Sequence, residues 1–180
     1  MFVKLAQFLN IMLYVLVAGV LWGTWLSLGR TMTRYDAAIF LADGNHMIDN
    51  LAAVMAVLMI SAAVVGLVVV VLLFRRRSTA AGWLALAGLL LLVAVIAVTL
   101  AVEVPIDNKI KTWTPPTLPP DWTDIRARWA AFHTLRTFLS LAAVAAAAGA
   151  ALTVRPATAE GLAAREQPEP ESLSRAERLD

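Results

Sequence analysis

Six side chains able to bind or move charge recur at helical spacing in the last third of the chain. They follow one another in alternating steps of four and three residues: Trp122, Arg126, Trp129, His133, Arg136 and Ser140. On a helix with about 100° between residues, such steps place them all in one narrow stripe. Indoles stack on flat rings, guanidinium groups hold anionic oxygens, and an imidazole transfers protons near neutral pH. The stripe therefore predicts a site for a flat, oxygen-rich aromatic molecule.

A purely structural explanation of these residues stays open. Tryptophan gathers at membrane interfaces, and arginine extends toward the headgroups there, in proteins without any site. Trp113, Trp122 and Arg128, taken singly, fit that role. Interface anchors need only a common depth, however, and not a common direction. A functional interpretation is favoured most for His133 and Arg136, which would lie deepest in the membrane.

The composition indicates what kind of protein must hold this stripe. Of the 180 residues, 60% are hydrophobic and 16% are charged, against roughly 45–50% and about 25% in soluble domains. This excludes a soluble enzyme and a disordered protein. The absence of cysteine excludes disulfides, thiolate metal centres and cysteine nucleophiles. A net charge of +2 with scattered basic residues gives no support to nucleic-acid binding. We expect a membrane protein whose main partner is the lipid bilayer.

Four apolar segments are long enough to cross a membrane, for which a helix needs about 20 residues. They cover about residues 8–29, 51–74, 81–102 and 132–154. The expected fold class is therefore all-α, with residues 1–154 forming a four-transmembrane-helix bundle that has two longer loops on one membrane face. Residues 155–180 are rich in proline and charge and contain no aromatic residue, which predicts a disordered polar tail.

The even number of spans places both termini on the same side as the turn between the second and third spans. That turn contains Arg75, Arg76 and Arg77, and positive charge favours the cytoplasmic face. We therefore expect a multi-pass protein of the cell membrane with cytoplasmic termini.

Small residues predict how two of the spans pack. Gly19, Gly23 and Ser27 recur every four residues in the first span, and the fourth span is rich in alanine. Such smooth surfaces let helices approach closely in lipid. We expect the first and fourth spans to pack against each other. Assembly into a homo-oligomer stays open.

Prolines divide the segment that leads to the stripe. Pro105 is expected to end the third span, and four further prolines between residues 115 and 120 to keep the next connection extended. Asp121 is suited to cap the last helix, residues 122–154. This helix has 33 residues and a length of about 50 Å, so its first turns would project from the bilayer core.

A set of residues between Pro105 and Thr137 carries a resemblance to a known family. It comprises the VPIDN run at residues 104–108, Ile110, Trp113, Pro120, Asp121, Trp122, Arg126, Arg128, Trp129, His133, Arg136 and Thr137. With the looser GTWLS run at residues 23–27, this set resembles the anthrone oxygenase-like family of small four-helix membrane proteins, many of whose bacterial members are of unknown function. The resemblance implies an oxygenase that converts an anthrone to an anthraquinone with O₂ and needs no metal or organic cofactor.

The resemblance also implies roles for individual residues. The tryptophan and histidine implicated in the family correspond to Trp129 and His133. In the expected chemistry, His133 removes a proton from the substrate, and Arg136 and Arg126 stabilise the developing oxyanion. The residues expected to bind substrate are Arg126, Trp122, Asn108 and Trp25. A hydrophobic aromatic molecule and O₂ are thus the expected small-molecule partners.

Two other functions fit the same residues. A metal-dependent oxidase would use His46 and His133 with one carboxylate, drawn from Asp43, Asp49, Glu103 and Asp107. Asp43 and Asn45 have a simpler explanation as turn or cap residues before the second span. Alternatively, the protein is a membrane scaffold or accessory subunit whose stripe packs against a partner. The chain contains no catalytic triad pattern, phosphate-binding glycine loop or dinucleotide fingerprint, which excludes hydrolases, kinases and nicotinamide enzymes.

Overall fold

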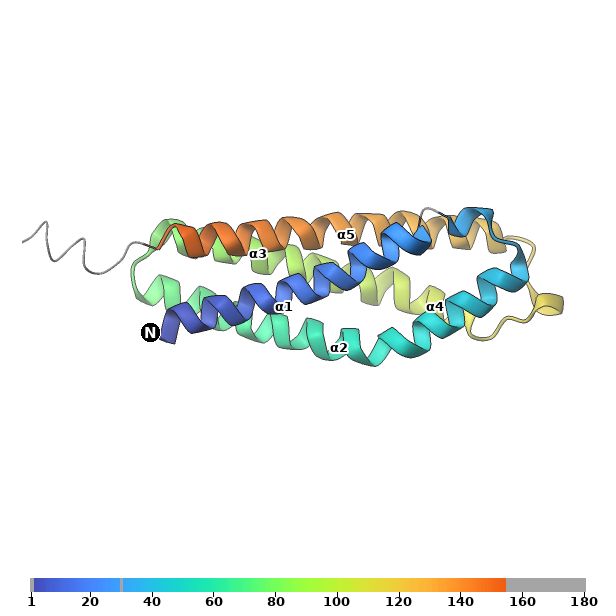
Figure 1. The fold of residues 1–180 in the computed structure, drawn as a ribbon, viewed down its shortest axis with the longest axis horizontal. Helices are drawn as coiled ribbons and strands as arrows, with labels where there is room; N and C mark the ends of the chain where they lie inside the picture. Colours follow the sequence, from blue (N-terminus) through green and yellow to red (C-terminus); the bar gives the residue numbers. More distant parts are fainter. Residues whose placement is uncertain (1, 30, 155–180) are drawn as a thin grey trace, which may run out of the picture.

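A computed structural model of the protein describes residues 2–29 and 31–154 (Figure 1). Its elements, in chain order, are α1 (Phe2–Thr24), η1 (Trp25–Gly29), η2 (Met32–Arg34), α2 (Ala37–Arg75), α3 (Thr79–Val98), η3 (Thr99–Glu103), α4 (Val104–Ile110), η4 (Pro115–Thr117) and α5 (Trp122–Leu152). Within these residues, four helices are long and apolar enough to cross a membrane. The predicted all-α, multi-pass architecture is therefore confirmed, and the predicted tail, residues 155–180, lies outside the described residues.

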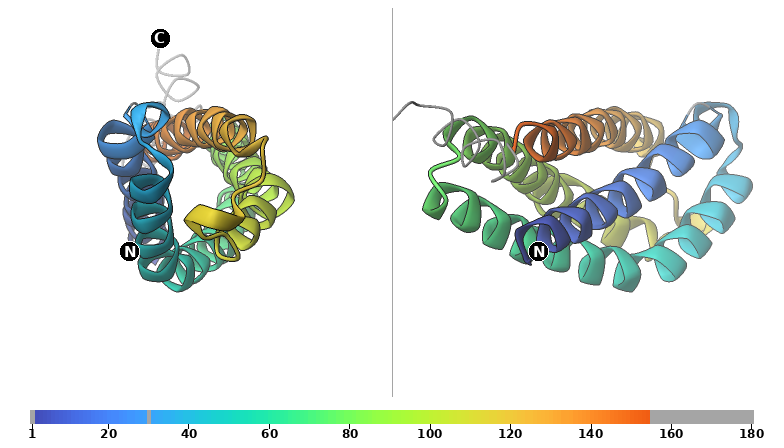
Figure 2. Two further views of the ribbon diagram at one scale, coloured as in Figure 1. Left: turned by 90° about the vertical axis from the view of Figure 1, so that its right-hand side faces the viewer. Right: turned by 60° about the vertical axis from the view of Figure 1, so that its left-hand side comes forward.

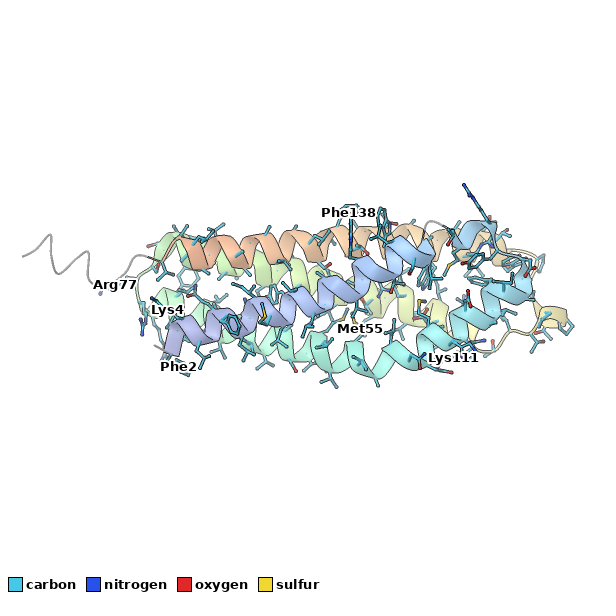
Figure 3. All side chains as sticks on the ribbon, viewed as in Figure 1. Phe2, Lys4, Met55, Arg77, Lys111 and Phe138 are labelled. Carbon is cyan, nitrogen blue, oxygen red and sulfur yellow. The ribbon has the colours of Figure 1, made fainter. Side chains whose placement is uncertain are left out.

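The long helices run side by side along the long axis of the molecule (Figures 1 and 2). α1 and α3 each pack against both α2 and α5, which closes the bundle. The connections before α2 and before α5 lie at one end, and the α2–α3 turn lies at the other end with the N-terminus (Figure 1). Lys4 and Arg77 mark the latter end, and Lys111 lies toward the opposite one (Figure 3). Two connections on one face were predicted, and the structure confirms them.

The second span begins earlier than predicted, because α2 starts at Ala37 and not near residue 51. Its N-cap is Asp36, whose side chain accepts a hydrogen bond from the Ile39 amide at 2.9 Å. The expectation that Asp43 and Asn45 form a turn or cap is therefore wrong, since both lie inside α2. In the part of α2 before residue 51, apolar residues at helical spacing form the inner face of the helix, and the polar residues lie on the other face.

The third span continues past Pro105, which was expected to end it. A π-helical turn, η3, connects α3 to α4, and the Val104 amide bonds to the Thr99 carbonyl five residues earlier. Pro105 is then one of the first two residues of α4, where a missing N–H costs nothing. The helix extends to Ile110 and shortens the predicted loop. This extension carries Glu103 and Asp107 into the bundle.

The first span packs against the fourth as predicted, but not through Gly19 and Gly23 of α1. Gly19 and Gly23 are exposed, and a methyl group at either would meet nothing within 4 Å. α1 instead turns larger buried side chains inward, among them Tyr14 and Leu21. The alanine-rich helix α5 approaches α3 closely at Gly88, where an added Cβ would lie 3.2 Å from the Ala143 carbonyl oxygen.

Candidate functional site

The predicted stripe lies on the inner face of α5. This helix begins at Trp122, and the backbone carbonyl of Asp121 accepts hydrogen bonds from the amides of Asp124 and Ile125, whereas its side chain makes no capping bond. Trp122 is half-buried, and the remaining stripe residues are buried: Arg126, Trp129, His133, Arg136 and Ser140. Since buried charges and imidazoles inside a membrane bundle need partners, the neighbours of these side chains define the site.

Three of these residues line one cavity. A cavity of about 290 Å³ lies between α1, α2, the α3–η3–α4 helix and α5, and Trp129, His133 and Arg136 line it. Most of the other lining side chains are apolar, and Asp107 and Thr99 add polar groups from the third span. The volume is close to the lower limit of about 300 Å³ for small-molecule sites. The side chains expected to act together are thus gathered around one chamber.

Hydrogen bonds fix the protonation state of His133. Its Nε2 lies 3.2 Å from the Leu21 carbonyl oxygen, and a carbonyl can only accept, so Nε2 carries the proton. Its Nδ1 lies 3.0 Å from Nη2 and 3.3 Å from Nε of Arg136, and a guanidinium can only donate. His133 is therefore a neutral imidazole whose lone pair is directed at Arg136. Both ring nitrogens are therefore engaged by protein groups, and neither is available to a ligand in the cavity.

Arg136 is the cationic centre of the site. Its Nη2 lies 2.9 Å from Oε2 of Glu103, a side chain with no exposed surface, and its Nη1 donates to Thr99 Oγ1 at 3.2 Å. The π turn η3 brings both of these partners to α5. Arg136 thus contacts Glu103, Thr99 and His133 at one wall of the cavity, where it can also face a developing negative charge.

Trp129 connects the imidazole to a carboxylate. Its ring is stacked on that of His133 with 4.8 Å between centroids and 5° between planes. Its Nε1–H donates to Oδ1 of Asp107 at 3.0 Å. Because the side chain is only 2% exposed, both contacts are shielded from the surroundings. Trp129 therefore fixes the orientation of Asp107 at the cavity wall.

Arg126 and Trp122 lie outside this cavity, although both were predicted to bind substrate. The Arg126 guanidinium donates to the Tyr35 carbonyl at 2.8 Å and lies 4.6 Å from the centroid of Trp122. Trp122 also contacts Phe40 of α2. In the described structure these two residues join the start of α5 to the α1–α2 connection.

Trp25 and Asn108, the other predicted substrate-binding residues, also do not line the cavity. Trp25 donates to Thr134 Oγ1 at 3.0 Å and stacks on Trp22. Asn108 is exposed on α4, next to the inward-facing Asp107. The chamber is therefore built from fewer stripe residues than expected, and from more of the third span.

The residues predicted for a metal-dependent oxidase do not assemble. His46 is exposed on α2, whereas His133 is buried among α1 and α5 residues. Within residues 2–29 and 31–154, no group of three histidine or carboxylate side chains is placed to hold a metal ion. The alternative that joined His46 and His133 in one metal site therefore does not fit this arrangement.

Sequence reasoning missed the role of Thr99, and considered Glu103 and Asp107 only as possible metal ligands. A usable signal was present, because inward-facing positions of the third span continue at helical spacing past the apolar run. They are Val95, Thr99, Glu103, Ile106 and Ile110, in steps of four, four, three and four residues. Ending the helix at Pro105 concealed this continuation.

Most residues around the cavity, apart from those of α1, fall in the part of the chain that matches a known family. The sequence profile of the anthrone oxygenase family matches residues 45–148, more than half of the chain. The chain belongs to the anthrone oxygenase family. The matched region extends from α2 into α5 and contains Asp107, Trp129, His133 and Arg136, so the resemblance predicted from the sequence is confirmed. Comparisons with curated proteins and with solved structures found no match.

Proposed function

We propose that this member of the anthrone oxygenase family is an integral-membrane oxygenase that converts an anthrone, or a similar polycyclic phenol, to a quinone with O₂. The observation that carries the proposal is the convergence of Trp129, His133, Arg136 and Asp107 on one cavity of about 290 Å³. Scattered interface anchors would not be expected to share a chamber inside the bundle. Polar groups from both α5 and the third span line this cavity, so a substrate could present its oxygen to one of them and its acidic C–H group to another.

The apolar walls support a flat aromatic ligand. Met47, Met55 and Met59 of α2 line the cavity, and methionine adapts to the shape of a ring and makes favourable sulfur–aromatic contacts. The polar wall, by contrast, offers the guanidinium of Arg136. A polycyclic molecule with its rings against α2 and its oxygen toward Arg136 satisfies both surfaces.

The reaction uses the acidity of the substrate. An anthrone carries a CH₂ group whose deprotonation gives an electron-rich anion that can reduce O₂ directly, so the resemblance to cofactor-free enzymes is chemically consistent. Arg136 would stabilise the negative oxygen of this anion. The largely apolar lining of the cavity would strengthen that interaction and admit apolar O₂. Over the whole reaction the substrate loses two hydrogens and gains one oxygen atom, and the second oxygen atom leaves as water.

We further propose that the substrate enters from the bilayer. Ile60 of α2, Leu100 of η3 and Val104 of α4 line the cavity and are 65%, 64% and 38% exposed. These side chains belong to candidate spans, so their exposed surfaces would face lipid. A hydrophobic polycyclic molecule dissolved in the membrane could therefore reach the cavity without passing through water.

The proposal is tested by measuring oxygen uptake and product mass with the purified protein and a series of reduced polycyclic phenols, anthrone first. We expect uptake above the protein-free rate and a product containing one added oxygen atom. A protein that turns over none of the series would contradict the proposal and favour the membrane scaffold or accessory subunit.

We also propose that both termini face the cytoplasm. The support is the cluster Arg75, Arg76 and Arg77 at the end of the bundle that holds the N-terminus. Since the chain has no cysteine, Ser78→Cys and Thr117→Cys each introduce a single thiol. A membrane-impermeant thiol reagent should label only Thr117→Cys in intact cells. Labelling of Ser78→Cys alone would reverse the orientation.

A further inference from the structure

We propose that Asp107, and not His133, is the base that removes the proton from the CH₂ group of the substrate. This assignment rests on the proposed function and specifies how its first step occurs. It follows from the hydrogen bonds of the side chains that line the cavity. Two other candidates, His133 and Glu103, are excluded by their contacts.

His133 lacks a lone pair that faces the cavity. Its Nε2 is protonated and donates to the Leu21 carbonyl, while its Nδ1 accepts from Arg136 at 3.0 Å. Proton uptake at Nδ1 would break the contact with Arg136 and leave two cations side by side in a buried site, which is costly. The imidazole instead holds the guanidinium in place, so His133 is a positioning residue.

Glu103 is also committed to Arg136. Its Oε2 lies 2.9 Å from Arg136 Nη2, and its side chain has no exposed surface. It does not line the cavity. A substrate in the chamber would therefore meet the guanidinium and not this carboxylate.

Asp107 has the contacts that a base requires. It lines the cavity, and the indole N–H of Trp129 binds only its Oδ1, at 3.0 Å. Among residues 2–29 and 31–154, no donor is hydrogen-bonded to Oδ2 and no cation forms an ion pair with this carboxylate. Lys111, one helical turn away, is instead paired with Asp49 at 2.7 Å. One oxygen is thus anchored, and the other is available to a substrate proton.

The assigned steps balance in atoms and charge. Asp107 takes one proton from the CH₂ group, and the resulting anion transfers an electron to O₂. The radical pair then forms a carbon–oxygen bond, and Asp107 returns its proton to the peroxide. A second C–H proton moves to Asp107 as the oxygen–oxygen bond breaks, which forms the quinone carbonyl and releases hydroxide. That hydroxide takes the proton from Asp107 and leaves as water.

The test isolates proton removal from oxidation. Purified protein is mixed with anthrone in D₂O without oxygen, and deuterium entering the CH₂ group is followed by mass spectrometry. The wild-type protein should accelerate the exchange above the protein-free rate. Asp107→Asn keeps the size and the acceptor for Trp129 but cannot take up a proton, so the acceleration should fall by about 10²–10⁴-fold. Asp124→Asn removes an exposed carboxylate at the start of α5 and should leave the exchange unchanged.

Formate distinguishes a chemical from a structural role. Asp107→Ala removes the carboxylate, and formate added to this variant should restore exchange in proportion to its concentration. An Asp107→Asn protein that exchanges at the wild-type rate would overturn the assignment, and so would a loss in both variants that formate does not restore. If the wild-type protein accelerates exchange but consumes no oxygen, the base assignment stands and the oxygenase proposal fails. If the wild type and Asp107→Asn take up oxygen at the same rate, the base assignment fails and the oxygenase proposal stands.

Discussion

Arg136 and Glu103 form an ion pair inside the bundle, where α5 passes the π turn η3 within the third span. Arg136 Nη2 lies 2.9 Å from Glu103 Oε2, and the glutamate has no exposed surface. Removing one member of a buried pair leaves an uncompensated charge, whereas replacing both by apolar residues is often neutral. The pair therefore links the stability of the bundle to the electrostatics of the cavity.

Replacing Arg136 alone should destabilise the protein. We expect Arg136→Met to lower the free energy of unfolding by about 3–5 kcal/mol, because Glu103 is left without its cation. The double variant Arg136→Met/Glu103→Met should recover most of this loss while remaining inactive, since the guanidinium that faces the substrate is gone. Unfolding in mixed detergents measures the first quantity and oxygen uptake the second. A double variant as unstable as the single one would show that the pair does not act as a unit.

Substitutions of His133 should separate positioning from base catalysis. His133→Gln keeps one acceptor for Arg136 and one donor for the Leu21 carbonyl, whereas His133→Leu keeps neither. If the imidazole orients Arg136, Leu should lower kcat by about 10²-fold and Gln by clearly less. Equal and complete loss in both variants would instead support His133 as the base. Steady-state oxygen uptake provides the measurement.

Trp129→Phe tests the indole N–H while keeping an aromatic ring against His133. The variant loses the hydrogen bond to Asp107 Oδ1, and a bond to a charged group contributes about 1.5–3 kcal/mol. We expect a lower kcat with a nearly unchanged KM, because Asp107 would lose its fixed orientation. Trp83→Phe, at a tryptophan that is 61% exposed on α3, is the control and should have no effect. An unchanged kcat in Trp129→Phe would remove this positioning role.

A bulky residue at the lipid-facing edge of the cavity should slow substrate entry. Ala56 of α2 is exposed and lines the cavity, whereas its neighbour Ala53 is exposed and does not. We expect Ala56→Trp to lower kcat/KM by about tenfold, which corresponds to about 1.4 kcal/mol, and Ala53→Trp to leave it unchanged. Equal effects of the two variants would argue against entry at this edge.

Gly88 should tolerate a methyl group less well than Gly23. A Cβ at Gly88 would lie 3.2 Å from the Ala143 carbonyl oxygen, and backbone atoms cannot move aside as a flexible side chain can, whereas a Cβ at Gly23 meets nothing within 4 Å. Helix propensity favours alanine at both sites. We therefore expect Gly88→Ala to lower the free energy of unfolding by about 1–3 kcal/mol and Gly23→Ala to leave it unchanged or raise it. The opposite order would restore the predicted packing of α1 through its small residues.

The inward direction of the stripe could be predicted from the sequence, because spacing along a regular helix determines which side chains share a face. The four apolar helices could also be predicted, because an apolar run of about 20 residues is long enough to cross a membrane. The stripe alone did not determine which of its members reach a common cavity. Arg126 and Trp122 lie at the N-terminal end of α5, and their neighbours there are Tyr35 and Phe40 rather than a ligand chamber.

Two local features could not be derived from residue types. Pro105 usually marks the end of a helix, but the π turn before it places the proline at the start of a new helical segment, where it is tolerated. The start of α2 was placed too late because polar residues such as Asp43 and Asn45 interrupt the apolar run without interrupting the helix. The first of these errors, at Pro105, concealed the contribution of the third span to the site. Asp107 and Glu103 acquire their roles only through this three-dimensional arrangement.

The central claim is that this cavity performs an oxygenase reaction. Mass spectrometry of the product formed from anthrone under ¹⁸O-labelled dioxygen tests it most directly. We expect a quinone that has lost two hydrogens and gained one labelled oxygen atom, formed faster than without protein. Asp124→Asn should retain this activity, and Asp107→Asn and Arg136→Met should lose it. A rate no faster than the protein-free reaction, or an oxygen atom derived from water, would contradict the claim.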